Sequence, residues 1–163
     1  SMAATDPLTG LPNRRGLQSA LNESLPAVQA AHITALYLID LDGFKPVNDE
    51  FGHEVGDRLL IAVSDRLRQL LRGADVVARL GGDEFVVLAT GLSNEEHARQ
   101  LGEELLAAFE LPFDLGELSV WVGASIGYAL APLDGSDPNR LMQRADAAMY
   151  QGKRQGKQQL IRI

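Results

Sequence analysis

The chain has 163 residues, of which 45% are apolar and 23% are charged, the balance of one folded domain rather than a disordered segment. It contains no cysteine, which excludes a disulfide framework, a cysteine nucleophile, thiolate-bound zinc and iron–sulfur chemistry. A net charge of −7 argues against a general nucleic-acid binder, and no apolar run approaches the ~18 residues of a membrane span.

The termini and the charge distribution suggest how the chain is organised. We interpret residues 1–2 (Ser-Met) as a remnant of cloning and residues 3–163 as one domain cut from a longer protein. Residues 140–163 carry a local charge of +5, whereas residues 1–139 carry −12. A solvated acidic surface with a basic tail explains this asymmetry, and so does a site that needs both cation and phosphate ligands.

The first half of the chain predicts a helix, a buried strand and a second helix. Asn13 stands where a helix would be capped, and Pro26 follows its apolar positions Leu17, Leu21 and Leu25. Residues 33–39 form an unbroken apolar run that stops at Asp40, as a buried strand does. Apolar residues then recur at helical spacing from 55 to 72.

The second half predicts a hairpin, two helices and two strands. Short strand patterns at 76–77 and 85–88 flank a turn at 80–83. Ser93 and Glu96 form a capping-box pattern before a helix over 98–109. Residues 120–130 alternate as a strand, Asp137 and Pro138 open another helix, and residues 159–163 suggest an edge strand.

This order of elements predicts an α+β fold. The core succession of strand, helix, strand, strand, helix, strand is the ferredoxin-like split βαβ pattern. We therefore expect an antiparallel central sheet with helices on one face and an extra helix at the N-terminus.

The same topology brings acidic residues together. In a split βαβ sheet the first strand lies antiparallel to the third, so Asp40 at the end of one meets Asp83 and Glu84 at the start of the other. Carboxylates held close raise one another's pKa unless a cation lies between them. Oxygen ligands of this kind suit Mg²⁺, and two such ions with phosphates form a phosphoryl-transfer site.

Simpler interpretations exist for each part. Residues 81–83 alone are a good turn, and an isolated His53 is more often a packing residue than a ligand. Residues 40–43 resemble the start of an EF-hand loop. Phe44 and Lys45 then stand at positions five and six of that loop, where they do not fit, so the EF-hand interpretation fails. No Walker lysine motif, dinucleotide fingerprint or His-Glu-x-x-His motif occurs.

Taken together, the motifs closely resemble the GGDEF family, the diguanylate cyclases. Residues 79–85 read Arg-Leu-Gly-Gly-Asp-Glu-Phe, which contains the sequence that gives the family its name. Further matching segments lie at 6–15, 40–49, 51–53, 56–57, 125–127 and 145–150, in the family's order and spacing. The resemblance covers nearly the whole chain and implies the palm-like fold of nucleotide cyclases.

The resemblance implies condensation of two GTP molecules into cyclic di-GMP with release of pyrophosphate, in the cytoplasm of a bacterium. By position, the implied ligands of two Mg²⁺ or Mn²⁺ ions are Asp40, the Leu41 carbonyl, Asp83 and Glu84, with Asp83 also the acceptor of the 3′-hydroxyl proton and Glu84 catalytic beside it. The implied guanine contacts are Asn48, His53 and Asp57. The implied phosphate contacts are the amides of Gly43 and Phe44 together with Lys45, Lys153 and Lys157.

Two departures from the family pattern affect these expectations. The family commonly has arginine where this chain has Lys157, and lysine offers a point charge instead of a planar fork. Arg72 and Asp75 match the family's product-inhibition site, but the further arginine from the next helix is missing. Glu103 and Glu104 stand in that region, and Arg99 is the only basic candidate there.

The implied partners are GTP, cyclic di-GMP, a second copy of the domain, and fused sensory or EAL phosphodiesterase domains. Contact with nucleic acid or, for this fragment, with a membrane is not expected, although the parent protein is free to be membrane-anchored. Two alternatives stay open beside the cyclase. One is a GTP-binding module that regulates an attached phosphodiesterase or another partner, and the other is a purely structural interaction domain.

Overall fold

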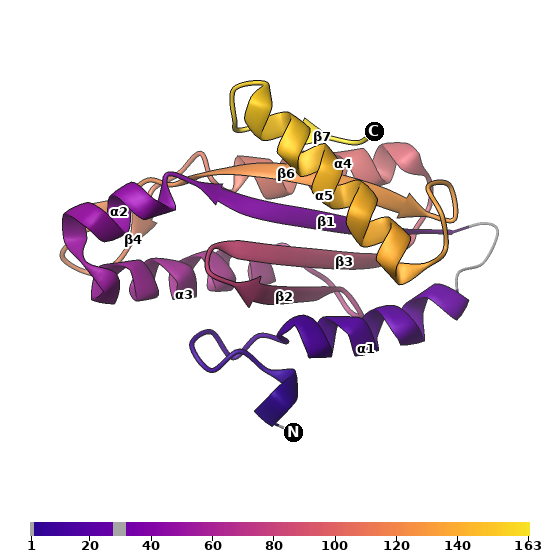
Figure 1. The fold of residues 1–163 in the computed structure, drawn as a ribbon, viewed down its shortest axis with the longest axis horizontal. Helices are drawn as coiled ribbons and strands as arrows, with labels where there is room; N and C mark the ends of the chain where they lie inside the picture. The colour runs from indigo at the N-terminus through magenta and orange to yellow at the C-terminus, as the bar shows by residue number, and fades with distance from the viewer. Residues whose placement is uncertain (1, 28–31) are drawn as a thin grey trace.

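The computed structural model describes residues 2–27 and 32–163 (Figure 1), so Ser1 lies outside the described residues. Its helices are α1 (Arg14–Ser24), α2 (Phe44–Phe51), α3 (His53–Gln69), α4 (Glu95–Ala107) and α5 (Pro138–Arg154). Its strands are β1 (Ile33–Asp42), β2 (Val76–Gly81), β3 (Glu84–Leu92), β4 (Phe113–Asp114), β5 (Ser119–Val120), β6 (Gly123–Ala131) and β7 (Leu160–Ile161). Short 3-10 turns cover Met2–Ala4 and Leu25–Ala27.

A five-stranded sheet in the order β2-β3-β1-β6-β7 forms the centre of the fold. The four strands β2, β3, β1 and β6 pair antiparallel, which confirms the split βαβ core. The edge strand β7 departs from the expected antiparallel sheet, because it runs parallel to β6. Helix α5 returns the chain to the starting end of β6 before β7 begins, and such a crossover makes the next strand parallel.

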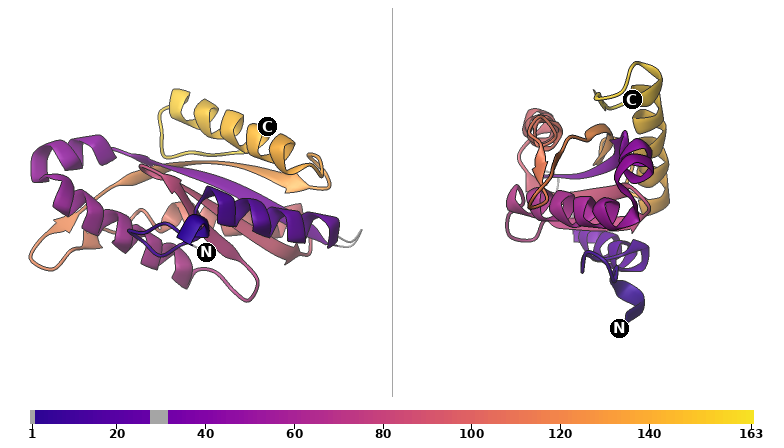
Figure 2. Two further views of the ribbon diagram at one scale, coloured as in Figure 1. Left: turned by 60° about the horizontal axis from the view of Figure 1, so that its bottom comes forward. Right: turned by 90° about the vertical axis from the view of Figure 1, so that its left-hand side faces the viewer.

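Helices cover both faces of the sheet rather than one, as the two further views show (Figure 2). Leu36 and Leu38 of β1 pack with residues of α1 and α5. The alternate residues Tyr37 and Ile39 pack with residues of α3 and α4 on the opposite face. This corrects the expected single helical layer, and it explains why β1 is apolar without interruption.

The ends of the elements follow local chemistry, with two corrections. Asn13 caps α1 by accepting from the Gly16 amide at 3.1 Å, and the helix ends before Pro26, as predicted. The cap of α4 is Asn94, not Ser93: its Oδ1 accepts from the His97 amide at 2.9 Å. The predicted strand over 120–130 is interrupted, because Val120 pairs with Phe113 in the small β4–β5 hairpin before β6 begins.

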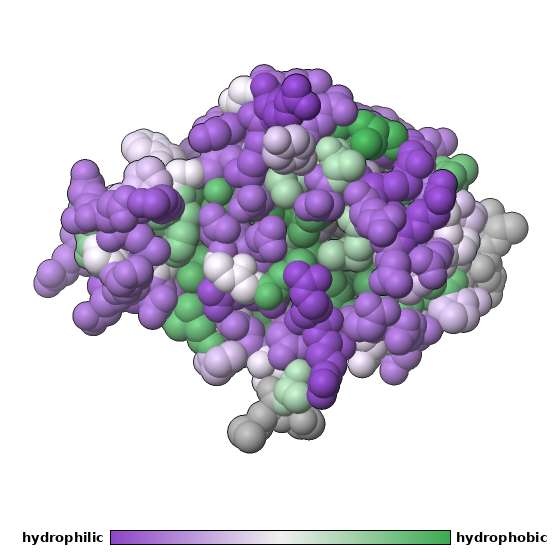
Figure 3. Space-filling model, viewed as in Figure 1, coloured by the Kyte–Doolittle hydropathy of each residue, from purple (hydrophilic) through white to green (hydrophobic). Residues whose placement is uncertain are grey.

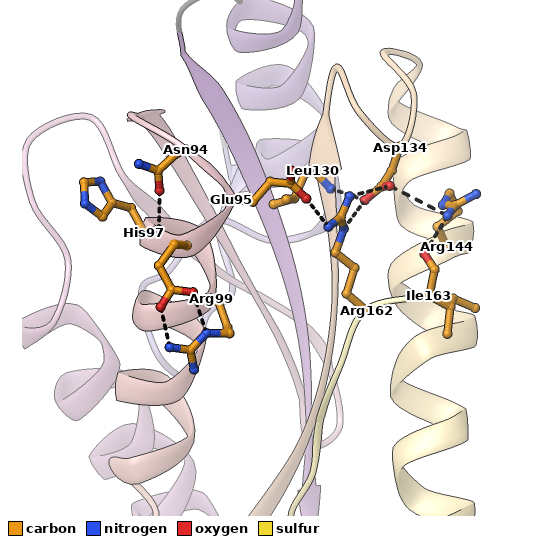
Figure 4. A network of polar contacts seen from close by, with 10 residues as sticks. Asn94, Glu95, His97, Arg99, Leu130, Asp134, Arg144, Arg162 and Ile163 are labelled. Carbon is orange, nitrogen blue, oxygen red and sulfur yellow. Dashed lines mark hydrogen bonds and ion pairs between the residues drawn. The ribbon is translucent and has the colours of Figure 1, made fainter.

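The C-terminal strand is fixed to the sheet by a polar network (Figure 4). Arg162, just after β7, donates to both carboxylate oxygens of Asp134 at 2.9 and 3.0 Å and pairs with Glu95 at 2.7 Å. Asp134 is buried, and burial alone would raise its pKa. The hydrogen bonds from Arg162 and the Leu130 amide outweigh burial, so the pKa of Asp134 is lowered and the carboxylate stays charged.

The face that carries α5 and α1 is largely hydrophilic, with hydrophobic side chains showing through between the two helices (Figure 3). A shallow cavity of about 290 Å³ lies there, lined by Leu38, Leu80, Met142, Glu84 and other residues. None of the helices in the described residues is long and apolar enough to span a membrane.

Candidate functional site

The acidic residues predicted to converge do lie at one edge of the sheet. Asp40 is paired directly with Glu84 in the register of β1 and β3. The Leu41 amide donates to the Asp83 carbonyl at 3.2 Å, which joins the end of β1 to the turn between β2 and β3. Strand pairing therefore assembles the predicted set Asp40, Leu41, Asp83 and Glu84, which we call the acidic edge.

Arg79 holds the turn that presents Asp83. Its Nε and Nη2 donate to the Gly82 carbonyl at 3.1 and 2.8 Å, and its Nη1 pairs with Asp6 at 2.9 Å. Both side chains of this ion pair are largely buried. The sequence interpretation gave no role to Asp6 or Arg79, although both belong to the matching segments. Their role shows only when the N-terminal segment is seen packed against the turn.

Asp40 is the most strongly perturbed carboxyl group of this edge. Burial raises its pKa to about 6, the negative charge of Asp83 acts in the same direction, and Lys153 opposes them from 3.5 Å. Lys153 also pairs with the buried Asp42 at 2.7 Å. Burial disfavours the charge on Lys153, but these two carboxylates outweigh it and raise its pKa.

A cation fits this edge only when a bound ligand supplies further coordinating atoms. Across residues 2–27 and 32–163, no three acidic, histidine or cysteine side chains are placed to hold a metal ion by themselves. Glu84 lines the cavity between α1 and α5. What remains is the Asp40 and Asp83 carboxylates with a backbone carbonyl, a donor set that suits Mg²⁺ when substrate phosphates complete the coordination.

The predicted guanine residues lie at the junction of α2 and α3. Asn48 lies against Gly56, where any Cβ would overlap the Asn48 Oδ1 atom, and Asp57 is the next residue along the chain. Among the described residues, nothing donates a hydrogen bond to the buried Asn48 Oδ1. His53 and Asp57 are exposed at the start of α3. Helix α2 itself was not predicted, because its eight residues carry too short an apolar pattern.

The predicted phosphate residues are only partly brought together. Gly43, at φ 89°, begins α2 beside the acidic edge, so the Gly43 and Phe44 amides stand at a helix N-terminus. Lys153 reaches the same edge. Lys45 instead forms an exposed ion pair with Asp49 at 2.7 Å, and Lys157 lies in an exposed turn after α5.

Arg72 and Asp75 line a separate cavity of about 410 Å³ at the end of β2 that lies away from the acidic edge. Asp75 accepts from the Arg72 and Thr90 amides at 3.3 and 3.2 Å. The second arginine of this cavity is Arg68, one turn earlier on α3. The predicted candidate Arg99 does not line it and pairs with Glu96 and Glu103 on its own helix.

Known proteins resemble this chain in sequence over nearly its whole length. The sequence model of the family described as "Diguanylate cyclase, GGDEF domain" matches residues 3–159. The chain is 44% identical over 157 residues to the bifunctional diguanylate cyclase/cyclic di-GMP phosphodiesterase MucR of Pseudomonas aeruginosa, covering 96% of this chain and 23% of MucR. It spans about a fifth to a quarter of the length of the curated relatives that it matches first.

Solved structures share the fold at similar identity. The GGDEF domain of PA1120 (YfiN or TpbB) from Pseudomonas aeruginosa superposes with a TM-score of 0.89 at 37% identity, over 94% of this chain and 96% of that one. A microbial GGDEF domain described in an interaction with cyclic di-GMP superposes with a TM-score of 0.83 at 35% identity, over 99% of both chains. The family match, the relatives and the shared fold all support the resemblance seen in the motif at residues 79–85. The chain belongs to the GGDEF domain family of diguanylate cyclases.

Proposed function

We propose that this chain condenses two molecules of GTP into cyclic di-GMP. Each 3′-hydroxyl oxygen forms a bond to the α-phosphorus of the other GTP, the bond from that phosphorus to pyrophosphate breaks, and two pyrophosphates leave. The observation that carries the proposal is the acidic edge, where the pairing of β1 with β3 brings Asp40 beside Asp83 and Glu84. Such an arrangement is favourable only around a cation, and GTP is normally bound with one.

The residues present fit a resident Mg²⁺ or Mn²⁺, with two ions per site as the family implies. Asp40, Asp83 and the Leu41 carbonyl would hold it, with Glu84 beside them. When bound, the metal polarises phosphate oxygens and lowers the pKa of the attacking hydroxyl. Asp83 would accept the 3′-hydroxyl proton, while Lys153 and the amides of Gly43 and Phe44 would hold the phosphates.

Recognition of guanine is assigned to Asn48 and Asp57, with His53 at the rim. A buried acceptor without a partner costs about 1–3 kcal/mol, so Asn48 Oδ1 is stabilised by a ligand that donates to it. The Watson–Crick edge of guanine carries N1–H and N2–H donors together with the O6 acceptor. An amide and a carboxylate complement this edge, whereas adenine lacks the N1–H donor.

Residues 2–27 and 32–163 offer one acidic edge and one such base site, so the second GTP would be held by a second copy that faces the first. We further propose that the domain acts in the cytoplasm, where GTP is available, and that its parent protein carries additional domains. A second candidate function is a GTP-binding module that regulates a fused phosphodiesterase, since a relative 40% identical over 158 residues is named as a cyclic di-GMP phosphodiesterase.

Product analysis with GTP and Mg²⁺ separates the candidates, with Asp83→Asn as the test variant. The cyclase hypothesis predicts cyclic di-GMP from the wild type and none from Asp83→Asn, with both proteins folded by circular dichroism. Asp65→Asn removes the same charge from an exposed position on α3 and is the matched control. GTP binding without product would favour the regulatory module, and unchanged product from Asp83→Asn would overturn the assignment of the acidic edge.

A second measurement tests the base site. Turnover of GTP should exceed that of ATP by several orders of magnitude, because a site that hydrogen-bonds a base edge rejects an analogue that leaves its groups unpaired. Asn48→Ala and Asp57→Ala should reduce this ratio. Equal rates with the two nucleotides in the wild type would remove both residues from the specificity role.

A further inference from the structure

The buried carboxylate of Asp42 is the most fully bonded acidic group near the site, and the function proposed above assigns it no role. Only 8% of the residue is exposed. It lies two residues after Asp40 on the same face of β1, opposite Gly123 in the pairing of β1 with β6. Its surroundings therefore combine the end of β1, the start of β6 and the end of α5.

Three donors contact this carboxylate. Lys153 Nζ donates to Oδ1 at 2.7 Å, and the Gln158 amide donates to Oδ2 at 3.0 Å. The fully buried Ser125 places its hydroxyl 3.0 and 2.9 Å from the two oxygens. Because an ionised carboxylate offers about four lone-pair positions, these three donors leave Asp42 at most one position for a metal ion.

The segment that Asp42 holds is conformationally unusual. Lys157 and Gln158 have φ values of 67° and 51°, in the left-handed region that non-glycine residues rarely adopt. Such a conformation persists only where the surrounding contacts fix it. The Gln158 amide bonded to Asp42 is one of these contacts, and the Lys157 amide bonded to the Gly152 carbonyl at 3.1 Å is another.

We propose that Asp42 is the positioning residue of the phosphate-binding lysines. It holds the Lys153 ammonium beside Asp40 by a direct ion pair, and it holds Lys157 through the backbone of the neighbouring Gln158. With the Lys153 side chain and the Lys157 backbone fixed before substrate arrives, GTP binding loses less conformational entropy. The proposal rests on the proposed function, because the anion that the lysines meet is the triphosphate of GTP.

Metal dependence distinguishes a positioning residue from a metal ligand. Calorimetry with GTP is performed on the wild type, Asp42→Asn and Asp40→Asn, with Mg²⁺ and with EDTA. Asp42→Asn should weaken GTP binding about tenfold under both conditions, because its effect passes through the lysines. Asp40→Asn should weaken it only with Mg²⁺. A loss in Asp42→Asn that is confined to Mg²⁺ would identify a metal ligand and overturn the proposal.

A double-mutant cycle tests the route through Lys153. In a Lys153→Met background, Asp42→Asn should cost much less affinity for GTP than it does in the wild type, with only the part carried by Lys157 remaining. Fully additive losses would show that Asp42 acts independently of Lys153. Ser125→Ala removes the hydroxyl but keeps the carboxylate, so it should weaken GTP binding less than Asp42→Asn does.

Hydrogen exchange gives a readout that needs no nucleotide. In Asp42→Asn the amides of residues 156–158 should exchange at least tenfold faster, while the amides of β1 keep their protection. Unchanged protection of the Gln158 amide would overturn the proposal, even if the protein binds GTP. A wild type that binds no GTP, with the turn deprotected in Asp42→Asn, would instead refute the proposed function and retain Asp42 as the residue that holds the turn.

Discussion

The burial of the Asp40 carboxylate, together with its repulsion by Asp83, predicts that Asp40→Asn stabilises the metal-free protein at neutral pH. The pKa of Asp40 is about 6 in the folded chain against an ordinary value of 3.8. A difference of this size corresponds to about 3 kcal/mol. Because the carboxylate is only partly buried and is screened by solvent, we expect about 1–2 kcal/mol to be realised.

The sign follows from the direction of the shift. The folded state keeps its proton to higher pH than the unfolded state, so the favourable contribution of Asp40 is complete below about pH 3.8. It is lost as the pH rises through about 6. Asparagine has nearly the same size and carries no charge. The stability of Asp40→Asn therefore does not decrease through this group as the pH rises.

Urea unfolding in EDTA between pH 4 and 8 measures the effect. The free energy of unfolding of Asp40→Asn relative to the wild type should rise by about 1–2 kcal/mol across this range, most steeply at about pH 5 and levelling off above about pH 6. Asp65→Asn, at an exposed position, should show no comparable rise. Mg²⁺ should stabilise the wild type at pH 8 more than Asp40→Asn. A relative stability of Asp40→Asn that is independent of pH, or that falls, would refute the reasoning.

Three further predictions concern other parts of the molecule. Calorimetry with cyclic di-GMP should show salt-sensitive binding that is weakened by Arg72→Ala and by Arg68→Ala but not by Arg99→Ala. Identical binding by Arg72→Ala and the wild type would show that Arg72 does not contact the ligand. Specific activity should increase with protein concentration and with a fused coiled coil, because two copies must meet; a constant value in a demonstrated monomer would contradict this. Arg162→Ala should lower the free energy of unfolding by about 1–3 kcal/mol, measured in urea, because it leaves the buried Asp134 carboxylate poorly paired. Adding Asp134→Asn should recover part of that loss, and equal losses in the two proteins would argue against this cause.

Much of the fold was readable because local patterns and topology agree. The apolar run of β1, the turn at residues 80–83 and the capped start of α5 each predicted their element, and their order selected the split βαβ core. The convergence of Asp40 with Asp83 followed from that topology, since antiparallel pairing of β1 with β3 leaves no other arrangement. Motif chemistry then pointed to the family.

What the sequence alone could not determine depends on contacts between distant segments. Periodicity does not report on which side of a sheet a helix packs, so the second helical layer and the parallel β7 became visible only in three dimensions. In the cavity lined by Arg72, the second arginine is Arg68 and not the expected Arg99, because α3 borders this cavity and α4 does not.

The same limit applies to the charges of the site. A sequence shows Asp40 and Asp42 as two equivalent carboxylates two residues apart. Tertiary packing gives Asp40 an acidic neighbour and a raised pKa, whereas Asp42 receives a lysine, a hydroxyl and a backbone amide. The residue types set what each group is able to do, but only the folded surroundings decide which of the two is available to a cation and which holds the lysines in place.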